Sequence, residues 1–227
     1  MATMNTQKLK LAEARFMQRY PGGFLNPEMQ AIGKKHKVDK MFALAQDEFS
    51  RKKFRDPEAM TESMVKMVSR SSLISMFEKP RFRDVVRTMA HSEKEILTTG
   101  LEDFLHGKQQ RGFEAMTMTL AQWKLAKWPL LTVIPNYYRP TEEVLIKPTT
   151  VKGVINYFDI KNLTYSPTPT WDFYQRFRDE ILKMKPLVDD SLAPSNAAFL
   201  GFLMMSCREA DAHDSISPGI SDKRVIT

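Results

Sequence analysis

Apolar side chains recur at intervals of three and four residues along most of this chain, a spacing that marks one face of an α-helix. Val38, Met41, Ala45 and Phe49 show the pattern clearly. Similar stripes lie at 60–68, 82–89, 97–105, 113–123 and 174–184. The alternation of apolar and polar residues that indicates strands is scarce. The sequence therefore predicts a mainly α fold, a multi-helix bundle.

Two short motifs predict where helices begin. Asn26-Pro27-Glu28 and Asp56-Pro57-Glu58 each place a capping side chain before a proline and a carboxylate. The cap satisfies free N–H groups, proline fits the first helical position, and the carboxylate favours the positive end of the helix dipole. Upstream, Tyr20-Pro21-Gly22-Gly23-Phe24 is expected to end a helix that starts near Gln7.

The segment 128–148 is interrupted by four prolines. Within it, residues 131–134 and 142–146 are short β-prone runs that can pair as a hairpin. We therefore expect a Pro-rich connector at 128–148, with a β-hairpin as one form of it, followed by a short helix at 150–158.

The domain organisation follows from the apolar flanks of this connector, because a linker between domains is usually polar. We expect one compact helical domain over 1–210, with a basic N-terminal portion (1–127), the connector, and C-terminal helices (149–210). Residues 211–227 lack periodicity and are expected to form a loose tail.

Cysteine usage and hydropathy indicate a cytosolic protein. The single cysteine, Cys207, excludes an intramolecular disulfide and lies in an apolar run, so we expect it to be buried. Residues 1–16 lack the apolar core of a signal peptide. The longest apolar run, 197–207, is too short to cross a bilayer. We therefore expect a cytoplasmic location and no membrane partner.

Positive charge is concentrated near the N-terminus. Residues 1–70 hold 14 basic and 8 acidic side chains, whereas the whole chain has a net charge of +7. Several cations on one face attract polyanions by releasing counterions from phosphates. The candidate nucleic-acid-binding residues are Lys34, Lys35, Lys37, Arg51, Lys52, Lys53, Arg55, Arg81, Arg83 and Arg87. Phe54 can stack on a base; alternatively, these cations only end helices or face solvent.

Aromatic residues gather between positions 123 and 174. Most are expected in the core, where their polar tips find partners at its edge. Tyr137, Tyr138 and Arg139 are expected to be exposed and to contact a partner, since aromatic and arginine side chains anchor many interfaces. The partner can be another protein or a second copy of the chain.

Motifs for catalysis are missing. The sequence has no phosphate-binding glycine loop, no nucleophile elbow and no zinc-ligand spacing among its four histidines. Asp159 and Lys161 have the D-x-K spacing of metal-dependent nucleases, which need a second carboxylate such as Glu142 or Glu143. Charges in a solvated loop explain the same pair. We therefore name no catalytic residue, no metal ligand and no cofactor.

The motifs YPGGF, LISMFEK, WPLL, IKP and YSPTPTW, scattered between residues 20 and 171, resemble an uncharacterised family of stand-alone bacterial proteins of similar length. The resemblance implies a self-contained cytosolic domain of bacterial or phage type and brings no activity with it.

Three functions fit the sequence. The first is a non-enzymatic protein that binds nucleic acid or another acidic partner through its basic N-terminal third. The second is a protein–protein adaptor, for instance a subunit of a bacterial or phage-defence assembly. The third is a metal-dependent nuclease built on Asp159 and Lys161.

Overall fold

The computed structural model describes the backbone of residues 4–216 and the side chains as far as residue 208. This part of the chain contains α-helices and short 3-10 turns and no strand. The helices are α1 (Thr6–Arg19), α2 (Pro27–Lys35), α3 (Val38–Glu48), α4 (Pro57–Arg70), α5 (Glu78–Thr88), α6 (His91–His106), α7 (Gln109–Gln122), α8 (Trp128–Tyr138), α9 (Pro148–Tyr157), α10 (Trp171–Met184) and α11 (Asn196–Ile216). The mainly α prediction is confirmed.

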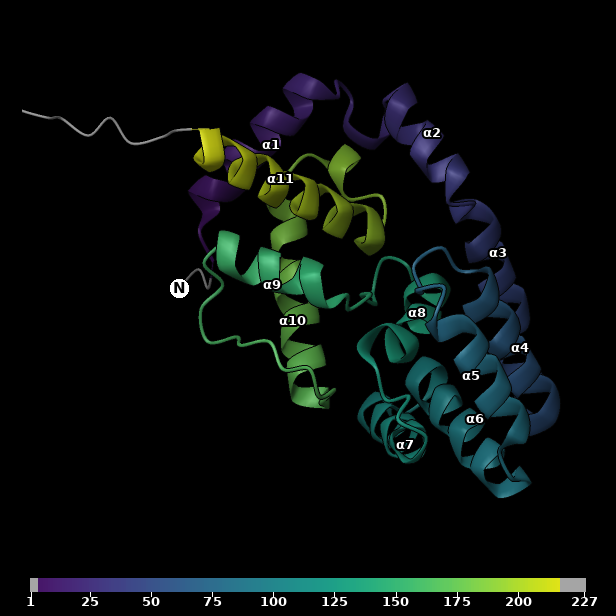
Figure 1. Cartoon of the computed structure of the whole chain (residues 1–227). Helices are drawn as coiled ribbons and strands as arrows, with labels where there is room; N and C mark the ends of the chain where they lie inside the picture. Colours follow the sequence, from purple (N-terminus) through teal and green to yellow (C-terminus); the bar gives the residue numbers. More distant parts are fainter. Residues whose placement is uncertain (1–3, 217–227) are drawn as a thin grey trace, which may run out of the picture.

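The helices form two groups. Figure 1 shows α3 to α8 gathered on one side and α1, α9, α10 and α11 on the other, with α2 leading from α1 to α3. In the first group α4 packs on α5 and α6, and α6 lies along α7. In the second, α11 packs on α1, α9 and α10. Contacts between α7 and α10 join the groups.

The helix starts expected at Asn26 and Asp56 are present. The Asn26 side chain accepts a hydrogen bond from the Glu28 N–H at 3.0 Å. The Asp56 carboxylate accepts from the N–H groups of Glu58 and Ala59 at 2.9 and 3.2 Å. These caps fix where α2 and α4 begin.

The prediction of a β-hairpin at 128–148 is wrong. Residues 128–138 form α8, which is buried on nearly every side, so its β-prone residues pack as a central helix. Residues 144–146 are buried and lie outside any helix, and two of their backbone N–H groups bond to side chains. The Ile146 N–H donates to Thr132 Oγ1 at 3.0 Å, and the Val144 N–H donates to the Tyr174 hydroxyl at 3.4 Å.

The C-terminal part of the chain differs from the prediction of a loose tail. Helix α11 continues to Ile216, into the segment expected to be a loose tail, and residues 217–227 lie outside the described part.

Cys207 is buried, as predicted. Among the helices described, none combines the length and apolar character needed to cross a membrane.

A set of aromatic rings packs where the two groups meet. Phe113 of α7 stacks on Tyr174 of α10, with ring centroids 5.6 Å apart. Phe104 of α6 meets the same tyrosine edge-on at 5.5 Å, and Trp128 of α8 lies 6.0 Å from Phe113. These rings are fully buried and form the part of the core shared by both groups.

A buried carboxylate lies beside these rings. Glu143, which is 1% exposed, accepts hydrogen bonds from Gln109 Nε2 and the Tyr174 hydroxyl, both at 2.7 Å. It also pairs with Arg139 and Arg178, each at 3.0 Å. Burial, and then the nearby Glu143 charge, raise the pKa of the Tyr174 hydroxyl well above its usual value, so it stays protonated and donates. The cluster ties α7 and the segment after α8 to α10.

Candidate nucleic-acid interface

The first basic cluster lies at the junction of α2 and α3. Lys34 and Lys35 end α2, where cations favour the helix dipole, and Lys37 has left-handed backbone angles that lead into α3. His36 Nδ1 is hydrogen-bonded to Ser72 Oγ at 2.8 Å, which places the cluster beside the segment after α4. The three lysines are exposed, and their side chains make no ion pair or hydrogen bond within the described residues.

The second basic cluster follows α3. It consists of Arg51, Lys52, Lys53 and Arg55, in and after a 3-10 turn. Arg51 donates to the His106 carbonyl at 2.5 Å, and Lys53 pairs with Asp47 at 3.1 Å. Lys52 and Arg55 are exposed, and the described part of the chain offers their side chains no partner.

One exposed face of α3 connects the two clusters. The helix has eleven residues and so rises about 16 Å. Lys40, Ala43 and Asp47 lie along this face at helical spacing, and Lys53 neutralises Asp47. Asp39 is an additional exposed carboxylate in the first turn. We define the α3 basic edge as Lys34, Lys35, Lys37, Lys40, Lys52 and Arg55.

The arginines of α5 have internal partners. Arg87 binds both carboxylate oxygens of Glu62 at 2.9 and 2.8 Å, and its hydrogen bond lowers the pKa of that carboxyl. Arg83 pairs with Asp84 at 2.8 Å, and Arg81 donates to the Trp123 carbonyl at 3.4 Å. Because these arginines already have partners within the chain, we leave them out of the candidate interface.

The three residues expected to be exposed for a partner differ in their surroundings. Tyr137 is buried, at 3% exposed, so its expected exposure is wrong; its hydroxyl lies 3.0 Å from Ser71 Oγ, and burial raises its pKa. Arg139 pairs with Glu143 and donates to the Phe104 carbonyl at 2.8 Å. Tyr138 is half-buried. Of the three, its side chain is the one left for contact with a partner.

An aromatic row links Tyr138 to the second basic cluster. The His106 ring lies between Phe54 and Tyr138 and meets both edge-on, with centroids 5.7 and 5.2 Å apart. Its Nε2 lies 2.8 Å from the Phe49 carbonyl and donates to it, which holds the ring in place. His106 was missing from the predicted site because it lies on α6, far from either neighbour in sequence.

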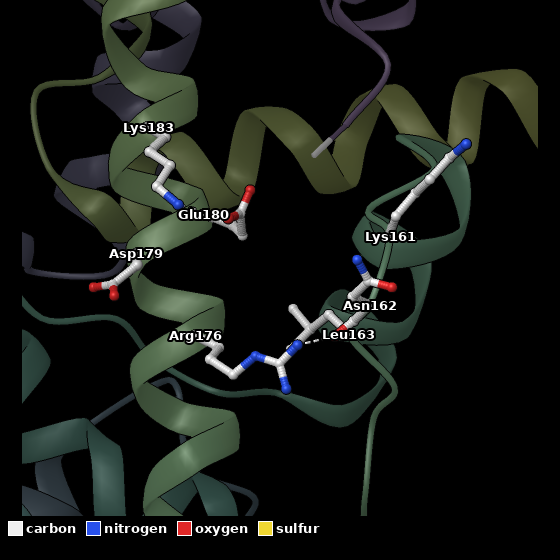
Figure 2. A pocket seen from close by; sticks show the side chains of 7 residues that line it. All are labelled: Lys161, Asn162, Leu163, Arg176, Asp179, Glu180 and Lys183. Atoms are coloured by element: carbon white, nitrogen blue, oxygen red, sulfur yellow. Dashed lines mark hydrogen bonds and ion pairs between the residues drawn. The ribbon is translucent and has the colours of Figure 1, made fainter. Parts of the chain in front are cut away.

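In the described structure, Asp159 contacts residues near the start of α1. The Asp159 carboxylate is held by Lys8 at 3.0 Å and by Asn5 Nδ2 at 3.1 Å, and these bonds lower its pKa. Lys161 lines a pocket beside α10 (Figure 2), where its side chain extends away from Arg176. Asp159 therefore ties the start of α1 to the turn after α9.

The described residues contain no group of three or more histidine, cysteine, aspartate or glutamate side chains that could hold a metal ion. Glu143, one of the two carboxylates considered as a partner for Asp159, is instead bound by Arg139 and Arg178.

Comparison with known proteins identifies no relative: the chain matches no protein-family model, no curated protein and no solved structure. The resemblance of its motifs to a bacterial family therefore stays a prediction, and the function has to be argued from the geometry.

Glu48 anchors the end of α3 that carries the second cluster. It accepts hydrogen bonds from Lys66 and, at 2.5 Å, from Ser63, and these lower its pKa below the usual 4.5. A carboxyl with a lowered folded-state pKa stabilises the fold above about pH 4.5 and loses that contribution as the pH falls through the folded-state pKa. Glu48→Gln should therefore be less stable than wild type at pH 7, and the difference should be smaller at pH 3. Urea unfolding at both values measures this, and an equal difference at both would contradict it.

Proposed function

We propose that the protein is a non-enzymatic nucleic-acid-binding protein that uses the α3 basic edge. One observation carries the proposal: the two clusters flank a single helix with one exposed face, and the cations of the edge make no ion pair within the described residues. Cations that have no carboxylate partner within the protein are available to bind phosphates. Arg83 and Arg87 of α5, in contrast, already pair with carboxylates.

The aromatic row adds a second element at one end of this edge. Phe54, His106 and Tyr138 lie next to Arg51 and Lys53, so partly exposed rings stand beside cations. Proteins that bind nucleic acid without reading its sequence combine a cationic track with aromatic side chains. The edge suits binding of this kind, with little sequence preference.

Charge reversal tests the proposal. Lys52→Glu/Arg55→Glu should weaken binding of a fluorescein-labelled 20-mer oligonucleotide by at least about tenfold, because two phosphate contacts become repulsive. Lys34→Glu/Lys35→Glu should act in the same direction from the other end of α3. Fluorescence anisotropy at constant salt measures both.

The matched control is Lys161→Glu/Arg208→Glu, which makes the same charge change at exposed positions outside α3 to α6. Binding should be almost unchanged. For wild type, neutralising five phosphates implies a loss of roughly 100-fold for a single strand between 50 and 200 mM salt. If all three double variants lose affinity equally, the α3 basic edge is not the interface.

A further inference from the structure

The segment between α4 and α5 carries two adjacent apolar side chains that face solvent. Phe77 is 88% exposed and Met76 is 80% exposed, the highest values among the large apolar residues described. We call this pair the Met76–Phe77 tip. Single exposed apolar residues are ordinary, but a neighbouring aromatic and methionine that touch no core are suited to contact with a partner.

Neighbouring residues hold the tip in place. Ile74 is buried, and the buried Ser71 hydroxyl bonds to Tyr137 and accepts from the Leu73 N–H at 3.1 Å. On the other side, Ser75 caps the next turn by accepting from the Glu78 N–H at 3.2 Å. The two side chains are therefore presented on an anchored turn, which reduces the conformational entropy lost on binding.

The surroundings of the tip are cationic. Ser72 is bonded to His36 and so brings the first basic cluster close. Arg70 and Lys79 flank the tip in sequence, and their side chains have no partner within the described residues. Glu78, the acidic residue beside the tip, pairs with Lys127 at 3.1 Å. A partner must therefore be anionic and must also offer an apolar face.

We propose that Phe77 of the Met76–Phe77 tip stacks on an unpaired nucleobase, which makes single-stranded nucleic acid the ligand of the α3 basic edge. This inference rests on the proposed function. A single strand presents bases beside phosphates, whereas a duplex hides the faces of its bases. A second copy of the chain would bring like charges together, and two apolar side chains are too few for stable membrane anchoring.

The geometry gives the strand a path. The segment that carries the tip is bonded to the first cluster through Ser72 and His36, and α3 separates that cluster from the second by about 16 Å. A strand that contacts Arg55 at one end and Phe77 at the other covers several nucleotides, within the range bound by other single-strand-binding surfaces.

Binding of labelled 12-mers tests the inference. The probes are oligo-dT, oligo-U and a 12-base-pair DNA duplex, which also separate DNA from RNA as the source of the strand. Phe77→Ala should weaken single-strand binding by about 5- to 150-fold, the range for loss of one base–aromatic stack. Duplex binding should stay within about twofold. Phe77→Trp should retain binding, whereas Phe77→Leu should lose as much as alanine, because leucine is apolar but cannot stack.

Met118→Ala, at a 69% exposed methionine of α7, is the control for loss of an exposed apolar side chain and should bind like wild type. Far-ultraviolet circular dichroism confirms that each variant is folded. The inference falls if Phe77→Ala weakens neither single strand or weakens the duplex equally, if Phe77→Leu binds like wild type, or if the tip inserts into phosphatidylcholine–phosphatidylserine vesicles. In those cases the charge-reversal result stands unaffected. Failure of every oligonucleotide to bind overturns the proposed function itself.

Discussion

Replacing Glu143 with alanine should destabilise the protein by about 3–5 kcal/mol, the usual cost of removing one partner from a buried ion cluster. Glu143 is 1% exposed, and its carboxylate bonds to two arginines, a glutamine and a tyrosine. Without it, the largely buried Arg178 keeps only the more exposed Asp179, 4.0 Å away, as an opposite charge, and the Tyr174 hydroxyl loses its acceptor. Urea denaturation at pH 7, followed by circular dichroism, measures the loss.

The neighbouring Glu142 provides a matched control. Its side chain is mostly exposed and pairs with Arg139 at 3.6 Å, so Glu142→Ala should change stability by less than about 1 kcal/mol. Glu143→Gln separates charge from hydrogen bonding, because the amide keeps one acceptor oxygen but removes the negative charge; it should fall between wild type and Glu143→Ala. If Glu142→Ala and Glu143→Ala cost the same, the cluster does not hold α10 against α7.

Local chemistry predicted the helix boundaries better than it predicted α8. The caps at Asn26 and Asp56 act within three residues, so the sequence contains both partners of each bond. Residues 131–134 prefer strands by composition, but here they are helical. Helices α3, α4, α6 and α7 pack around them, and this burial overrides the local preference. Nothing within the segment itself indicates that environment.

The candidate site, like α8, could be predicted only in part from the sequence. The basic clusters are visible in the sequence, but which of their cations are available depends on acids far along the chain. Arg87 is bound by Glu62, 25 positions away, whereas Lys52 has no partner in the described structure. The exposure of Phe77 is equally hidden, because an apolar residue before a helix is usually expected to pack. Ten cations therefore look equivalent in the sequence and are not equivalent in the fold.

The second large effect is expected at Gly112, where α6 and α7 approach each other closely. A Cβ at this position would lie 2.3 Å from the Phe104 backbone nitrogen and 2.4 Å from the Gly100 carbonyl oxygen. Backbone atoms cannot move aside as the end of a side chain can, so Gly112→Ala should separate the two helices. We expect a loss of about 3 kcal/mol or more, the upper end for overpacking, measured by thermal or urea unfolding.

Gly33 makes this prediction specific to close packing, because it is a helical glycine at which an added methyl group would meet no neighbouring heavy atom within 4 Å. Gly33→Ala removes backbone freedom from the unfolded chain without creating a contact, so it should stabilise the protein by about 0.5–1 kcal/mol. A glycine-to-alanine substitution is thus expected to lower stability at Gly112 and to raise it at Gly33. If Gly112→Ala is also stabilising, α6 and α7 must be farther apart than in this fold, and the aromatic junction between α6, α7 and α10 would have to be packed differently.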